Sequence, residues 1–208
     1  MLVNSGTSTE FVLTNSGDKI YFRSKTDNTG IARTTSNYLQ FTTTYDVKLV
    51  DVSGSVMSLL SPDFENLRQV RSYQFYSLFS QNTSIRGCDK LILPSTTLAG
   101  GCYSSIFSGC TSLTSAPALP AETLARWCYE YMFQGCTSLT QAPELPATTL
   151  ATGCYVSMFS GCTSLTSAPA LPATTLTDYC YSSMFKGCTS LTTAPSILPS
   201  TTLAGGCY

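Results

Sequence analysis

The chain has 208 residues and a formal net charge of −1, and only 11% of its residues are charged. Soluble proteins usually carry about 25% charged residues, and here Ser, Thr, Ala, Gly and Tyr take their place. No basic block is present, so nothing in the composition favours binding to nucleic acid. No apolar run approaches the roughly 18 residues of a membrane span, and we expect no membrane insertion by this segment.

Residues 1–72 are predicted to form a small β-rich N-terminal domain. Within it, the segments 9–13, 19–23, 39–42 and 46–52 alternate apolar with polar residues, which is the period-two pattern of strands. Turn-forming clusters rich in Asn, Asp and Gly separate the first three segments. We expect a small antiparallel β unit that caps the N-terminal end of the following repeats, with the apolar stretch 56–60 able to cover the first coil.

From residue 73 to residue 208 the sequence repeats. Four complete copies occupy 102–127, 128–153, 154–179 and 180–206, the last with one extra residue, and a degenerate copy occupies about 73–101. Two series of cysteines recur every 26 residues: Cys102, Cys128, Cys154 and Cys180 in the first, and Cys110, Cys136, Cys162 and Cys188 in the second. Self-similarity at this period predicts units that stack and share one core.

Each unit contains two prolines, Pro117 and Pro120 in the first complete copy, which exclude a long helix. Thr-Ser-Leu-Thr is predicted to be a short strand, and Ala-Thr-Thr-Leu a second extended piece. The Cys-Tyr-x-x-Met-Phe stretch is predicted to be a single helical or 3-10 turn that leads to a glycine. The expected fold class is therefore mostly β with short helical or 3-10 turns.

The pattern F-x-G-C-T-S-L-T, followed by L-P and a further Leu, resembles the BspA-like leucine-rich repeats on surface proteins of gut and oral anaerobic bacteria. The resemblance covers about residues 75–208, and the N-terminal segment resembles the β domain that often precedes such repeats. It implies a right-handed leucine-rich-repeat solenoid with a parallel sheet on one face, and adhesion or host-factor binding without catalysis. Ala-Pro stands where many members carry two β-branched residues, which leaves the strand length open.

The cysteines allow two structures. Each unit could hold a bridge between its two cysteines, as in Cys102–Cys110, with Cys88 and Cys207 left over. Alternatively, the cysteines form a ladder of buried reduced thiols, which Asn82 favours because it replaces the second cysteine in the degenerate copy. Gln74 replaces the first cysteine there, which also fits the loss of a bridge.

The recurring aromatic residues are predicted to pack as a ladder inside the stack. A phenylalanine recurs at the same place in each complete copy, as Phe107, Phe133, Phe159 and Phe185. A tyrosine also recurs directly after the first cysteine of each copy. An aromatic residue at the same place in every unit is the pattern of a shared core.

Enzymatic chemistry has little support in the sequence. The chain contains no histidine, so a Ser-His-Asp or Cys-His nucleophile is excluded. A zinc site is disfavoured by the C-x₇-C spacing and by the missing imidazoles. The carboxylates of the repeats are single and scattered. We expect neither catalysis nor a cofactor.

Positions that differ between copies are the candidates for binding. They include Arg126, Trp127, Tyr131, Asp178 and Tyr179. Variation within a strict repeat indicates side chains that no neighbour constrains, and exposed Trp and Tyr are preferred anchors in interfaces. These five residues are therefore predicted to form a ligand-binding edge, with incidental surface residues as the alternative.

The leading hypothesis is a non-catalytic extracellular adhesion protein that binds a host or bacterial surface protein or a glycan. A second hypothesis is a phage or virion fibre protein with the same repeats, and a third is an architectural spacer. No signal-peptide pattern follows Met1, and a new repeat opens at Gly206. We therefore expect a piece of a larger or processed chain at the cell surface, or alternatively in a virion, with self-association or attachment to a larger assembly.

Overall fold

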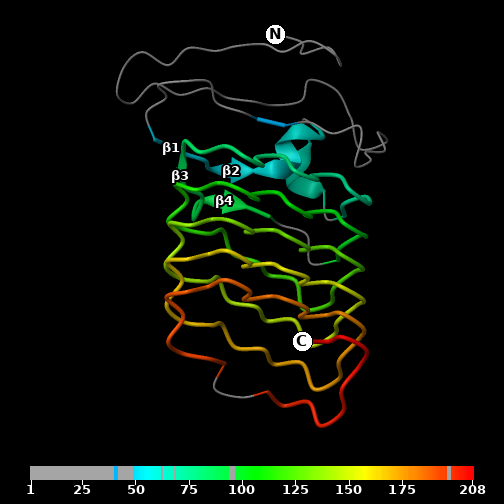
Figure 1. The fold of residues 1–208 in the computed structure, drawn as a ribbon. Coiled ribbons are helices and arrows are strands. Elements are labelled where there is room, and N and C mark those ends of the chain that lie inside the picture. Colours follow the sequence, from blue (N-terminus) through cyan, green and yellow to red (C-terminus); the bar gives the residue numbers. More distant parts are fainter. Residues whose placement is uncertain (1–39, 42–48, 62, 68, 94–96, 196–197) are drawn as a thin grey trace.

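The computed structural model describes residues 40–41, 49–61, 63–67, 69–93, 97–195 and 198–208. From residue 49 onward the chain winds through successive coils that lie one on another (Figure 1). The antiparallel β unit predicted near the N-terminus falls almost wholly outside the described residues. The regular elements are β1 (Val50–Asp51), β2 (Gly54–Ser55), η1 (Val56–Leu59), η2 (Phe64–Asn66), β3 (Ile85–Gly87) and β4 (Leu91–Ile92).

The segment 49–61 lies against the degenerate first copy of the repeat. β1 pairs in parallel with β3, and β2 pairs in parallel with β4. An exposed ion pair between Arg86 and Asp51 (Nη2 to Oδ2, 2.6 Å) joins the same two segments. Val56 and Met57 are buried in the core that runs on through the repeats. This segment therefore forms a coil of its own on top of the repeats.

In the cysteine-rich part of each coil, the backbone amides alternate between two kinds of partner. The N–H groups of Tyr103, Ser105 and Phe107 donate to carbonyls of the next coil, at 2.8–3.0 Å. The N–H groups of Ser104 and Ile106 donate to the carbonyl three residues earlier in their own coil, at 3.1 and 3.3 Å. The stretch predicted as one helical or 3-10 turn is instead a run of overlapping turns.

Every fourth residue of this run has a left-handed backbone. In the first complete copy these residues are Gly101, Ser105 and Gly109, with φ of 61°, 57° and 75°. Ser77, Tyr131, Ser157 and Ser183 share the conformation of Ser105. A residue with a Cβ adopts this conformation at a cost of about 1–2 kcal/mol. Residue propensity therefore does not predict the left-handed conformation at the serines. Hydrogen bonds to neighbouring coils have to stabilise it.

The other side of each coil is extended but forms little regular strand. Parallel bridges join Thr97, Thr123 and Thr149 in three successive coils. The predicted Thr-Ser-Leu-Thr strand is represented in the degenerate copy by β3, and in later copies by single bridges such as Ser167–Thr193. The prolines explain the shortness, because each one removes an N–H that a ladder would use.

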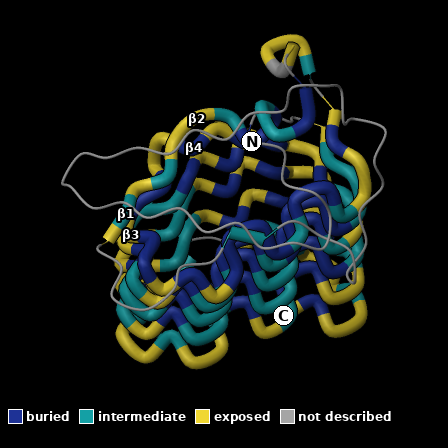
Figure 2. The backbone as a smooth tube through the Cα atoms, turned by 90° about the horizontal axis from the view of Figure 1, so that it is seen from above, coloured by how far each residue is buried: buried dark blue, intermediate teal, exposed yellow. Residues whose placement is uncertain are grey.

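A single core runs through all the described coils. The rings of the phenylalanine ladder lie 5.5–5.8 Å apart and within 12° of parallel, through Phe79, Phe107, Phe133, Phe159 and Phe185. The tyrosine ladder has ring spacings of 5.7–6.0 Å, through Tyr103, Tyr129, Tyr155, Tyr181 and Tyr208. Figure 2 shows buried chain inside and exposed chain outside. The aromatic ladders are thus present, while a right-handed leucine-rich-repeat solenoid stays a prediction.

Candidate functional site

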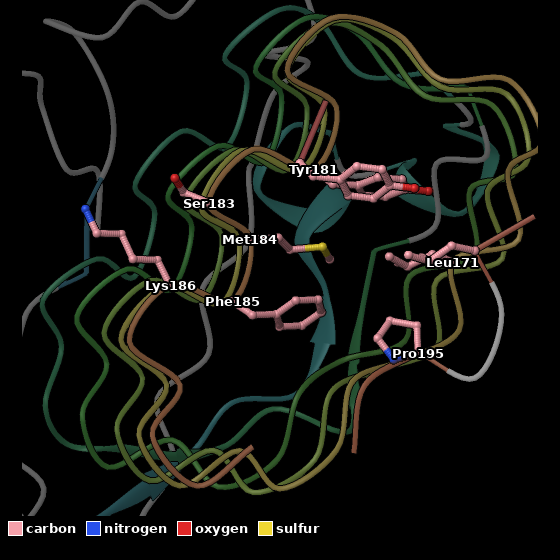
Figure 3. Close-up of a pocket in the computed structure, with 9 residues that line it drawn as sticks. Leu171, Tyr181, Ser183, Met184, Phe185, Lys186 and Pro195 are labelled. Carbon is pink, nitrogen blue, oxygen red and sulfur yellow. The ribbon is translucent and has the colours of Figure 1, made fainter. Parts of the chain in front are cut away.

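A hollow of about 290 Å³ opens at the C-terminal face of the stack. Figure 3 shows Tyr181, Met184 and Phe185 pointing into it, with Leu171 on its far side, while Lys186 points outward. The lining is largely apolar and contains no Asp, Glu or Cys side chain. The hollow lies at the C-terminal end of the described core, and its lining side chains provide no pair of groups for acid–base catalysis.

The second cysteine series bonds each coil to the one before it. Its thiols donate to the carbonyl of the preceding coil's ladder phenylalanine at 3.0–3.2 Å, and the donors are Cys110, Cys136, Cys162 and Cys188. In the degenerate copy, Asn82 Nδ2 donates to the Phe41 carbonyl at 3.1 Å, and the Phe41 ring stacks on Phe79. Asparagine and cysteine therefore make equivalent hydrogen bonds to a phenylalanine carbonyl at this position.

All ten cysteines are free thiols, and all but the half-buried Cys188 are buried. In the first series, the sulfur of Cys154 lies 3.8 Å from the carbonyl oxygen of Cys180 in the next coil. The sulfurs that influence Cys128 electrostatically are Cys102 and Cys154, one coil away on either side, and Cys136 of its own unit is not among them. The structure thus contains the thiol ladder, and the two cysteines of a unit belong to separate columns.

Burial keeps these thiols protonated. It raises the pKa of four of them to about 12, namely Cys102, Cys110, Cys154 and Cys162. The thiolate is the form that attacks electrophiles and binds metals. The protonated thiols of the ladder are therefore unreactive at neutral pH. Among the described residues, no three His, Cys, Asp or Glu side chains gather as ligands for a metal.

The residue just before the first cysteine alternates between an aromatic residue and glycine from coil to coil. Its backbone is left-handed throughout: φ is 55° at Trp127, 64° at Gly153, 58° at Tyr179 and 57° at Gly206. A Cβ built on Gly153 would lie 2.5 Å from Trp127 Cδ1, and one on Gly206 would lie 2.7 Å from Tyr179 Cε1. Each ring thus occupies the space that a side chain on the next coil would need.

This alternation corrects one inference from the sequence. In the sequence, the variation at Trp127 and Tyr179 indicates freedom from neighbours, but in the structure each of these rings lies where the next coil has a glycine and leaves no room for a larger residue. On this side of the molecule the structural repeat is two coils, and side-chain size is coupled between them.

Four of the five predicted edge residues lie along one side of the stack. Arg126 and Trp127 are adjacent in one coil, and Asp178 and Tyr179 occupy the equivalent positions two coils later. The Arg126 guanidinium lies 4.4 Å above the Trp127 ring. Asp178 Oδ1 accepts the N–H of Gly205 at 2.9 Å, and Tyr179 is 56% exposed, whereas Trp127 is half-buried. Tyr131 is half-buried at the next left-handed position, four residues farther along its coil.

The sequence reasoning missed Tyr73, which lies along the same side of the stack. It has φ of 55°, and its ring fills the space next to Gly101 of the following coil. We name the set Tyr73, Trp127 and Tyr179 the aromatic column. The signal that could have revealed Tyr73 is the order aromatic, Gly, aromatic, Gly at one register, had the degenerate copy been included in the comparison.

No protein-family model, curated protein or solved structure matches this chain. The likeness to BspA-like repeats therefore stays a prediction. No helix in the described part of the chain is long and apolar enough to cross a bilayer.

Replacing Gly153 with Ala should destabilise the protein through backbone strain of about 1–2 kcal/mol and through collision with Trp127. Gly135→Ala is the matched control, because φ there is 71° and the nearest atom to its new Cβ is Gly109 Cα at 3.8 Å. We expect Gly153→Ala to lower the urea midpoint more than Gly135→Ala does, and Trp127→Gly to remove the difference. Unfolding is monitored by circular dichroism. If Gly153→Ala lowers the urea midpoint equally in the presence and in the absence of the Trp127 indole, the coupling is contradicted.

The raised thiol pKa values predict loss of stability at alkaline pH. The pKa of an unfolded thiol is about 8.5, whereas burial raises the pKa of Cys102 and Cys162 to about 12 in the folded protein. Their contribution is fully present below the unfolded pKa and declines as the pH rises toward the folded one. We expect the urea midpoint to fall above about pH 9, with a shallower fall in Cys162→Ala. A midpoint with the same pH dependence in both proteins would show that buried thiols do not control it.

Proposed function

We propose that this chain is a non-catalytic binding module that works outside the cell and offers the outer surface of its coils to a host protein or a glycan. One observation carries the proposal: apolar residues that are constant between copies form the buried core, whereas residues whose charge changes between copies, such as Arg126 and Asp178, are exposed. Phe133 and Leu139 are fully buried and have the same identity in every complete copy. Arg126 and Asp178 share one register, are exposed, and differ in charge.

The composition of the outer surface indicates how such binding would work. Charged residues are only 11% of the chain, so long-range electrostatic steering contributes little. Hydroxyl groups, amides and a few aromatic rings remain for contact. Stacked repeats supply affinity through many shallow contacts spread over an extended face, rather than through one deep cavity.

An architectural spacer is the second candidate, because the aromatic residues have a packing role. Trp127 and Tyr179 fill space against glycines of the next coil. If this contact accounts for them entirely, the exposed face needs no ligand. The two functions differ in what happens when the rings are removed.

Biolayer interferometry of the whole chain over gastric mucin, collagen and immobilised glycans tests the proposal. We expect saturable binding to at least one surface, and a loss of at least tenfold when Trp127, Tyr131 and Tyr179 are replaced together with Ala. Glu144→Ala, an exposed change elsewhere on the coil, is the control, and circular dichroism checks folding. Binding that is unchanged by the triple substitution would favour the spacer, and the absence of saturable binding would overturn the module.

A further inference from the structure

We propose that the aromatic column binds a linear, uncharged β-1,4-linked glycan that lies along the axis of the stack. This inference rests on the binding function proposed above and names its ligand class. It starts from three rings at one register, in the first, third and fifth of five successive coils: Tyr73, Trp127 and Tyr179.

The spacing of the column suits a polymer with a two-unit repeat. Like rings of neighbouring coils lie 5.7–6.0 Å apart in the adjacent tyrosine ladder, so rings of the column, which are two coils apart, are separated by about 11–12 Å. In a β-1,4-linked pyranose chain, neighbouring sugars are turned by half a revolution, and every second sugar presents the same face at a similar interval. Gly101 and Gly153 occupy the coils between the rings, so these two coils have no side chain of their own at the register of the column.

The backbone alone does not require aromatic residues in this column. Glycine fills the same left-handed position in alternate coils without strain, as at Gly153. Tyr and Trp adopt it only against the cost of a bulky Cβ in that region. Because Ser105 and Ser157 share the left-handed backbone, it is the aromatic side chains and not the strain that point to a ligand.

The chemistry beside each ring suits sugar hydroxyls. The residues directly before the three rings are Ser72, Arg126 and Asp178, all of them polar and exposed. An aromatic ring can cover the apolar C–H face of a pyranose while the neighbouring polar group bonds to its hydroxyls. The positive charge of Arg126 and the negative charge of Asp178 give the column no net charge, which favours a neutral polymer over an anionic one.

The rings are also positioned in advance. Trp127 packs against the next coil's glycine, and Tyr179 rests on Gly206 while 56% of it stays exposed. A side chain that is already fixed loses little freedom when it binds, so less of the contact energy is lost to ordering.

The only tryptophan of the chain lies in the column and reports on it directly. We would titrate the whole chain with cellohexaose and chitohexaose and follow the emission of Trp127. A saturable change is expected, because a sugar that stacks on the indole displaces the guanidinium. Cellobiose should bind at least tenfold more weakly, since three rings spread over about 23 Å can be engaged together only by the longer chain. Maltohexaose, with α-1,4 links, should give no change.

Tyr179→Leu tests the column without altering the reporter. Leucine keeps an apolar side chain over Gly206 but removes the aromatic face, so we expect the affinity for the hexasaccharide to fall about tenfold while circular dichroism stays unchanged. Glu144→Ala changes an exposed residue outside the column and outside the predicted edge, and its affinity should match that of the original chain.

Three results would overturn the assignment: no saturable emission change with either β-1,4 hexasaccharide, equal affinity for maltohexaose, or affinity that Tyr179→Leu leaves intact. If one of these results is found while binding to mucin, collagen or another glycan is retained in the interferometry experiment, the column does not bind a β-1,4-linked glycan. The broader binding function is then still supported. Loss of both kinds of binding would remove the two proposals together.

Discussion

Every second amide in the turn-rich part of a coil donates to the neighbouring coil, and the rest of the structure depends on this division. Buried N–H and C=O groups have to be paired, yet the buried stretch around Phe107 is neither helix nor strand. Half of its amides close turns within the coil, and the other half join coils. The register is kept even where a copy has one extra residue, because Tyr179 and Tyr181 still donate to Gly205 and Cys207.

A fixed register places like side chains above one another, and the side-chain chemistry follows from that. Rings stack on rings, as Phe133 does on Phe107 at 5.6 Å. The thiol of Cys136 donates to the Phe107 carbonyl, which already accepts an amide from its own coil. A charged residue repeated at such a site would face its own copy one coil away, with little water to separate the charges. Neutral columns avoid this repulsion, and the low charge of the whole chain is consistent with them.

Repetition in the sequence predicted the unit length, the shared core and the aromatic ladders, because burial of Phe133 or Cys136 follows from identity at a fixed interval. It did not predict the local backbone, since nothing about Ser105 or Tyr131 signals a left-handed residue and only bonds to other coils hold them there. Nor did comparison of copies reveal the aromatic column. The size of Trp127 is set by Gly153 in the next coil, and that coupling needs distances between coils, which a sequence does not carry.

Hydrogen exchange read by mass spectrometry tests the alternating amides most directly. Peptides that cover the turn run of the central copies, residues 128–136 and 154–162, contain no helix and no strand among their described residues. If half of their amides bond to the next coil, both peptides should exchange slowly and together, as parts of one cooperative stack. Exchange of these amides within seconds, at the rate of an open loop, would contradict the structure of joined coils.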